Sequence, residues 1–460
     1  PSLRPGDAGA TYVISRWAGG LGAGEGASVL GVRAVGRYFE APEGASEVER
    51  HNFHHAFRES ALIGVINASI AFLPVFVARL GGTNFEVSLI TSLPSLTGVL
   101  LAIPLGTFMQ TRRNIMPWYA RGRIGSQLSY GLIALASMML PADRVVLGIL
   151  AVYAGATVFQ TATNVSFNIV MDATAGTQGR FELMSRRWSI MGAAQALSLL
   201  IVGAVLARLP FPLNYQLIFV GFALTGVWAY QYGSKIRVPD HPHTARGDAG
   251  TSALVRVRGI ASLVAAERVF LGFEVRRFVY AMSATLTLPL VPLYYVRVLH
   301  APDQWIAFMA TAQTLSLLIG YALWRHQAKR RGARFVLAAA TGGSALYPAI
   351  LSVTTALPLV ALLAGVAAVF TSGVNLAIFD RLMSKVPAGY GVTFNSIDTT
   401  VVYVAGSLPP LLVPVLAAQL GISGALVVSS AIGLAGAVLF ALDRDRAAPV
   451  AEPIGVEAAE

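Results

Sequence analysis

Acidic and basic side chains are scarce within the long apolar segments of this sequence, so each one found there is a candidate for chemistry. Asp398 is the deepest of the acids, at the start of an apolar run and flanked by hydroxyl and amide side chains. A buried carboxyl group can bind and release a proton near neutral pH, which makes Asp398 a candidate for proton coupling. The alternative is structural: Asp398 caps a helix or pairs with a nearby arginine.

Charged residues also stand at the ends of several apolar runs. Arg79 and Arg297 each follow a run, and Glu86 and Asp303 each begin the next one. We predict two ion pairs that close this end of the molecule, Arg79 with Asp303 and Arg297 with Glu86. The opposite end has its own candidate gate charges: Arg58, Glu59, Asp172, Glu274, Arg276, Arg277 and Asp380. The alternative is that all of them only mark the water interface, where an exposed pair contributes roughly 0–1 kcal/mol.

Amide and hydroxyl side chains inside apolar runs need polar partners, which either a neighbouring helix or a wet cavity supplies. Taken singly, each is explained by helix packing, whereas the whole set favours a substrate cavity. No basic residue is evident in the middle of a run, and this favours a neutral or amphipathic solute over a strongly anionic one. The cavity candidates are Asn67, Ser92, Gln160, Asn164, Gln195, Tyr280, Ser283, Gln313, Asn375 and Tyr403.

Other kinds of chemistry find little support. His51, His54 and His55 have helical spacing, with Glu47 and Glu59 four residues to either side, but a helix end at the membrane surface explains them as well as a metal does. There is no cysteine, no nucleotide-binding glycine loop ending in Lys-Ser/Thr, and no His/Asp/Glu cluster inside an apolar run. We therefore predict no metal, no cofactor and no enzymatic activity.

The high apolar content of the chain predicts which secondary-structure elements position these residues. The chain has 460 residues, 55% hydrophobic and 12% charged, whereas a soluble domain has about 25% charged residues. A membrane-spanning helix needs about 20 mainly apolar residues. We predict an all-α polytopic membrane protein with twelve spans at 61–77, 87–109, 125–140, 145–165, 188–206, 217–232, 278–296, 306–324, 335–352, 357–376, 399–416 and 424–442.

The first pair of spans recurs in the second half of the chain. Residues 57–113 match residues 275–331 after a shift of 218 positions without a gap. The shift superimposes Arg58 on Arg276, Pro74 on Pro292, Arg79 on Arg297, and the pair 112–113 on the pair 330–331. Two hydrophobic hairpins in the same orientation indicate a transporter built from two like halves.

Basic residues concentrate on one side of the predicted spans, and this side is expected to be cytoplasmic, with both termini. We assign 1–55 to a disordered, low-complexity N-terminal tail, 56–232 to the first six-helix half, and 233–270 to a cytoplasmic linker with an amphipathic segment. Residues 271–442 form the second half and 443–460 a C-terminal tail. The net charge is +11, but the basic residues lie between apolar runs and not along a soluble face, so no nucleic acid is expected.

Six spans, a basic linker and six more spans resemble the major facilitator superfamily of secondary transporters. The loop after the second span, 106–114, keeps Gly106, Arg112 and Arg113 of the family's signature, but Gln110 replaces its aspartate. The Gly-Pro motif of drug/proton antiporters is absent from the fifth span. The resemblance implies two pseudo-symmetric six-helix bundles in which the spans that carry the cavity candidates face each other.

The expected function is secondary active transport of a small organic solute across a prokaryotic plasma or inner membrane by alternating access. Proton-coupled export is the form that the resemblance favours, with the chain acting as a monomer. The alternatives are a facilitator or symporter for a small neutral nutrient and, in a different class, a receptor or scaffold on the same fold that transports nothing.

Overall fold

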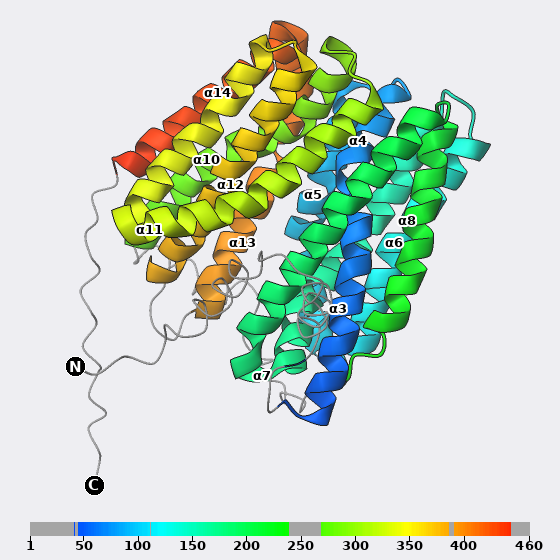
Figure 1. Ribbon diagram of the computed structural model, residues 1–460, viewed down its shortest axis with the longest axis vertical. Helices are drawn as coiled ribbons and strands as arrows, with labels where there is room; N and C mark the ends of the chain where they lie inside the picture. Colours follow the sequence, from blue (N-terminus) through cyan, green and yellow to red (C-terminus); the bar gives the residue numbers. More distant parts are fainter. Residues whose placement is uncertain (1–40, 42–44, 111, 239–267, 386–390, 443–460) are drawn as a thin grey trace, which may run out of the picture.

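The structure is a computed structural model that describes residues 41, 45–110, 112–238, 268–385 and 391–442. The regular elements of these residues are all helices, arranged as two bundles side by side (Figure 1). The first bundle comprises α3 (Glu47–Asn67), α4 (Ser69–Arg79), α5 (Asn84–Gln110), α6 (Met116–Met139), α7 (Val145–Arg208) and α8 (Leu213–Gly233). The second comprises α10 (Arg268–Leu293), the π-helix η1 (Tyr294–Val298), α11 (Asp303–Val353), α12 (Leu357–Lys385), α13 (Gly391–Ser407), the 3-10 helix η2 (Pro409–Leu412) and α14 (Val413–Ala441).

Eight helical stretches in the described residues are long and apolar enough to cross a membrane. Two of these stretches, Asp303–Val353 and Ile397–Ala441, each contain two of the predicted spans. Both are interrupted by a glycine with positive φ, Gly332 at 81° and Gly421 at 71°, a conformation that only glycine adopts without strain. Helices α6 and α8 are not among the eight, so the number of twelve spans stays a prediction. Many large apolar side chains are exposed on these helices, as expected of an integral membrane protein.

Helix α7 contains two candidate spans, Val145–Phe167 and Leu183–Arg208. The guanidinium of Arg187 lies 4.8 Å from the ring centre of Phe167. Twenty residues of straight helix would separate these two positions by about 30 Å. The chain therefore reverses direction between the two spans, and this reversal brings Arg187 into the interior of the first bundle.

The first helix starts earlier than the sequence suggested. Ser46 accepts a hydrogen bond from the Glu49 backbone N–H, and Glu49 accepts one from the Ser46 N–H, which forms a capping box. Helix α3 consequently begins at Glu47, inside the segment assigned to the tail, and it is separated from α4 by a break at Ala68. Residues 1–40, most of the linker and the C-terminal tail lie outside the described residues.

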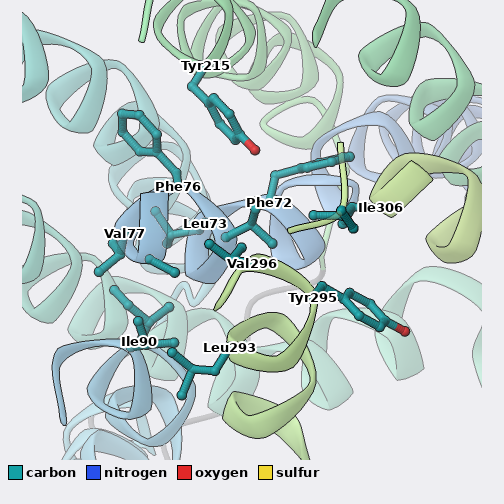
Figure 2. Close-up of a cluster of buried hydrophobic side chains, with 14 of the residues drawn as sticks. Phe72, Leu73, Phe76, Val77, Ile90, Tyr215, Leu293, Tyr295, Val296 and Ile306 are labelled. Carbon is teal, nitrogen blue, oxygen red and sulfur yellow. The ribbon is translucent and has the colours of Figure 1, made fainter. Parts of the chain in front are cut away.

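A cluster of buried apolar side chains joins the two halves at one end of the molecule (Figure 2). Helix α4 contributes Phe72 and Phe76, whereas Leu293 and Val296 come from α10 and η1, and Ile306 from α11. We call this end, which carries Arg79 and Asp303, the outer end, because the expected topology places it away from the cytoplasm. The opposite end is the inner end.

Candidate functional site

A cavity of about 400 Å³ lies inside the first bundle, lined by residues of α3, α6 and both spans of α7. Asn67, Gln160 and Asn164, three of the predicted cavity residues, line it. Asn67 is the last residue of α3, next to the break at Ala68, where backbone groups leave the regular helical pattern. The other lining residues are Ile63, Ile66, Arg123, Ser126, Gln127, Ser129, Tyr130, Tyr153, Ala156, Thr163, Phe167, Arg187, Trp188 and Met191.

A second hollow of about 310 Å³ lies between α7 and α11 near the outer end. Its lining residues are Leu200, Gly203, Gln304, Trp305, Ala307 and Phe308, and Leu200 and Phe308 are exposed. The lining is mainly apolar and offers few groups that could orient a solute. We take the polar cavity in the first bundle as the candidate site.

One wall of the cavity rests on a buried charged cluster. The Arg123 Nε donates a hydrogen bond to Glu59 Oε1 at 3.0 Å, and the Tyr119 hydroxyl donates to the same oxygen at 3.3 Å. Arg123 also donates to the Tyr119 hydroxyl oxygen at 2.9 Å. Tyr119 and Arg123 are four residues apart and so occupy one face of α6. Glu59 is fully buried, which makes the arginine necessary, because an unpaired buried carboxylate is strongly destabilising.

Arg187 is the second basic residue of the cavity. Only 3% of its surface is exposed, and no residue in the part of the chain that the structure describes accepts a hydrogen bond from its Nε. Its guanidinium packs on the Phe167 ring, and its charge interacts with those of Glu59 and Arg123. In the sequence Arg123 and Arg187 each precede a predicted span, and the lack of basic residues in the middle of the spans favoured a neutral or amphipathic solute. The structure differs because the spans begin earlier and the chain turns back between Phe167 and Arg187.

The remaining cavity candidates do not line this cavity. Those of the second bundle mostly hold helices together: Ser283 donates to the Ser429 carbonyl at 2.6 Å, and Asn375 donates to the Tyr321 hydroxyl at 3.2 Å. Packing also accounts for Tyr403, whose ring meets α5 at Gly98. Ser92, Gln195, Tyr280 and Gln313 are buried or half-buried away from the cavity lining.

Asp398 is 6% exposed and forms an ion pair with Arg277 of α10. The structure thus gives it the arginine partner that the structural alternative required. Glu274, one helical turn before Arg277, is 4% exposed, and both its carboxyl oxygens lack hydrogen-bond partners among the described residues. Asp398 thus holds the Arg277 guanidinium, and the Glu274 carboxyl group interacts with the same charge without a hydrogen bond. An apolar cluster that includes Phe270 and Phe394 lies in the same region.

At the outer end, Arg79 bridges the two halves. Its Nε donates to Asp303 Oδ1 at 2.8 Å, and its terminal nitrogen donates to the Ala301 carbonyl at 2.6 Å. This is the pairing expected from the sequence, although its role as a gate stays a proposal. Both side chains are largely buried, with Arg79 24% and Asp303 12% exposed.

The second outer pair differs from the prediction. Arg297 also crosses between the halves, but it donates to Asn84 Oδ1 and to the Gly82 carbonyl instead of to Glu86. Glu86 accepts hydrogen bonds from the backbone N–H and the hydroxyl of Thr83, at 2.6 and 2.9 Å. Its carboxylate thereby caps the start of its own helix, and neutral acceptors of the same turn take its place opposite Arg297.

At the inner end the described ion pairs lie within each half. Glu59 contacts Arg123 and not the second half, while Arg277 contacts Asp398. Arg58 lies 5.6 Å from the ring centre of Tyr232 in its own half, and Asp380 is exposed. Arg276 is half-buried, and the side chain of Asp172 lies outside what the structure describes.

The histidines and the loop after the second span have structural partners. His51 Nε2 lies 3.0 Å from the Lys235 carbonyl oxygen, and the described residues contain no group of three His/Cys/Asp/Glu side chains that could hold a metal. Arg112 stacks on Phe108 at 4.2 Å. Arg113 is exposed, Gly106 lies within α5, and the Gln110 side chain is outside the described part of the chain.

No protein-family profile and no curated protein sequence matches the chain. Solved structures do match. A D-xylose–proton symporter aligns with a TM-score of 0.63 at 15% identity, over 84% of this chain and 95% of that one.

Two further solved transporter structures also align with most of the chain. A bacterial homologue of the human lysosomal transporter Spinster, in an inward-facing and unoccupied conformation, aligns at a TM-score of 0.64 and 12% identity, over 87% of this chain and 97% of that one. The nucleoside transporter NupG aligns at 0.61 and 11%, over 86% and 98%. The expected major facilitator fold is therefore confirmed, and the chain has the all-α architecture of these transporters.

Proposed function

We propose that this protein is a secondary active transporter that moves a small organic solute through the membrane by alternating access, and that it is not an enzyme. The observation that carries the proposal is the unequal closure of its two ends. The halves share an apolar cluster and the Arg79–Asp303 pair at the outer end, whereas the described ion pairs at the inner end stay within one half. We take the closed outer end as support for a carrier that faces inward.

Proton coupling is the driving force that we propose, with Glu274 and Asp398 as the groups that exchange the proton. Two buried carboxyl groups and one guanidinium carry a net negative charge if all are ionised, and burial makes such a charge unfavourable. Binding one proton neutralises the cluster. Because Asp398 has Arg277 as its partner and Glu274 has no hydrogen-bond partner among the described residues, we infer that Glu274 is the better proton acceptor.

Export in exchange for protons is the direction we propose, in a prokaryotic plasma or inner membrane with both termini cytoplasmic and the chain acting as a monomer. These points rest on the resemblance and on the distribution of basic residues, not on a particular contact.

The test is substrate-dependent proton movement in liposomes that contain the full chain and an internal pH dye. Pools of metabolites and drugs are added to the wild type, Glu274→Gln and Asp398→Asn. We expect proton flux in the wild type that Glu274→Gln abolishes and Asp398→Asn reduces. Movement of labelled solute without proton flux would contradict the coupling and identify a facilitator. A full pool screen without solute movement, for protein shown to be folded, would contradict transport.

A further inference from the structure

The charges around the cavity do not cancel. Glu59 contributes one negative charge, and Arg123 and Arg187 contribute two positive charges. Glu59 accepts hydrogen bonds from Arg123 and Tyr119 through its Oε1 atom, whereas its Oε2 atom has no hydrogen-bond partner among the described residues. Among the side chains that the structure describes around the cavity, one positive charge is therefore in excess, and Arg187 is the arginine without an ion-pair partner there.

The surroundings of Arg187 make that charge difficult to leave alone. Only 3% of the residue's surface is exposed, and no described residue accepts a hydrogen bond from its Nε. A guanidinium taken out of water is strongly destabilising unless an anion accepts its hydrogen bonds. Phe167 offers a ring face but no acceptor. A planar guanidinium of this kind binds carboxylate or phosphate oxygens two at a time.

The rest of the lining suits an organic body attached to such an anion. Tyr130, Tyr153 and Trp188 provide aromatic surface, and Gln160 and Asn164 provide exposed amide groups. A volume of about 400 Å³ is in the range of small-molecule sites. The cavity thus combines one unmatched cation, aromatic walls and exposed amide groups.

We propose that the cavity binds an amphipathic organic anion whose carboxylate or phosphate group contacts Arg187 and whose apolar or aromatic body lies against the aromatic wall. This inference rests on the proposed transport function, because it names the class of solute that the same cavity would carry. It keeps the amphipathic character expected from the sequence and adds a negative charge, which the sequence did not favour.

Binding of matched probes tests the proposal. The full chain in lipid nanodiscs is titrated with 2-naphthoate, 1-naphthyl phosphate and the neutral 2-naphthamide, and dissociation constants are obtained from the thermal unfolding shift. We expect at least one anion to bind about tenfold or more tightly than the amide, because a hydrogen bond to a charged group is stronger than a neutral one. The tighter binder of 2-naphthoate and 1-naphthyl phosphate shows whether the site prefers a carboxylate or a phosphate group.

Substitutions in the cavity lining test whether anion binding depends on Arg187. Arg187→Gln is expected to weaken anion binding about tenfold or more while leaving amide binding unchanged, and Arg187→Lys to restore part of it. Gln160→Glu places a carboxylate at an exposed position of the lining and is expected to weaken anion binding in a chain whose core is unaltered. Gln231→Glu, at the exposed end of α8, and Arg121→Gln, on the exposed face of α6, are the matched controls.

Three results would overturn the anion site: equal binding of all three probes, an equal loss of all three in Arg187→Gln, or no binding of either anion. Measuring transport of the same probes in liposomes distinguishes failure of the anion site from failure of the proposed transport function. Anion binding through Arg187 without movement of any solute leaves the site in place and refutes transport. Proton-coupled movement of neutral solutes that Arg187→Gln does not affect leaves transport in place and refutes the site.

Discussion

Breaking the outer ion pair should open the outer end. In Asp303→Asn the Arg79 guanidinium loses its charged partner, and in Arg79→Gln both the carboxylate bond and the bond to the Ala301 carbonyl are weakened. A hydrogen bond to a charged group contributes about 1.5–3 kcal/mol, and the partial exposure of both side chains places this pair in the lower part of that range. A loss of about 2 kcal/mol changes a population ratio about 30-fold. We expect each variant to shift the equilibrium toward an outward-open state by about that factor.

The absence of cysteine makes the assay direct, since introduced cysteines are the only labelling sites. Spin labels at Ala142→Cys and Thr355→Cys report the distance between the halves at the outer end. Labels at Asn114→Cys and Lys329→Cys report the distance at the inner end. All four positions are exposed, and the label at Lys329 also removes a positive charge. Electron–electron distance distributions are compared in nanodiscs. The outer distance should lengthen and the inner one shorten in Asp303→Asn and Arg79→Gln.

The control is another ion pair near the same end. Arg144 and Asp143 are 3.5 Å apart but 75% and 71% exposed, so Arg144→Gln should leave both distances unchanged. Combining Arg79→Asp with Asp303→Arg should restore part of the closure, although an arginine at the start of α11 is unfavourable to the helix dipole. Unchanged distances in both single variants would show that the pair only marks the water interface, and would refute the gate.

Three further predictions concern coupling and packing. Glu274→Gln removes the unpartnered carboxyl group, so solute-driven proton flux should fall to the leak of empty liposomes while solute exchange continues. Asn52→Ala removes two hydrogen bonds of 2.8 Å to the Arg237 backbone and should lower stability by about 1–3 kcal/mol in thermal unfolding. Gly98→Val should push α5 away from the Tyr403 ring, which would lie 2.8 Å from an added Cβ, and destabilise the structure by about 1–3 kcal/mol.

Each of these has a control in the chain. Asp380→Asn changes an exposed acid and should keep proton flux, so equal flux in Glu274→Gln and Asp380→Asn would contradict the coupling role. His54→Ala changes an exposed neighbour of Asn52 and should be nearly neutral. Gly106→Ala adds a Cβ with ordinary 3.7 Å contact, so similar unfolding temperatures for it and Gly98→Val would show that the contact between α5 and α13 is loose.

The helices and the two-bundle fold could be predicted from the sequence because hydrophobicity is a local property. Asn67, Gln160 and Asn164 were found for the same reason, as polar residues within apolar runs. Arg123 and Arg187 were missed because each precedes an apolar run, and their burial depends on how the chain folds back. The four-residue spacing of Tyr119 and Arg123 was a signal in the sequence that both face the same way.

The ion-pair partners across the two halves were harder to predict than the positions of the charged residues along the chain. Asp303 and Glu86 both begin a helix after an arginine, and only the turn chemistry separates them. Thr83 precedes Glu86 by three residues, the spacing of a capping box, and holds its carboxylate on its own helix. Proline precedes Asp303 and has no hydroxyl with which to do so, which leaves that carboxylate available to Arg79.

The predicted repeat places the two charged clusters at matching positions of the two halves, with opposite signs. The shift of 218 residues that relates the halves superimposes Glu59 on Arg277. Each of these residues lies near the inner end of the first helix of its half, and each is buried beside charges of the opposite sign. Two arginines accompany Glu59, whereas two carboxyl groups accompany Arg277. The first half is thereby suited to hold an anion and the second to hold a proton, so duplication followed by an exchange of charge would divide solute binding and coupling between two similar bundles.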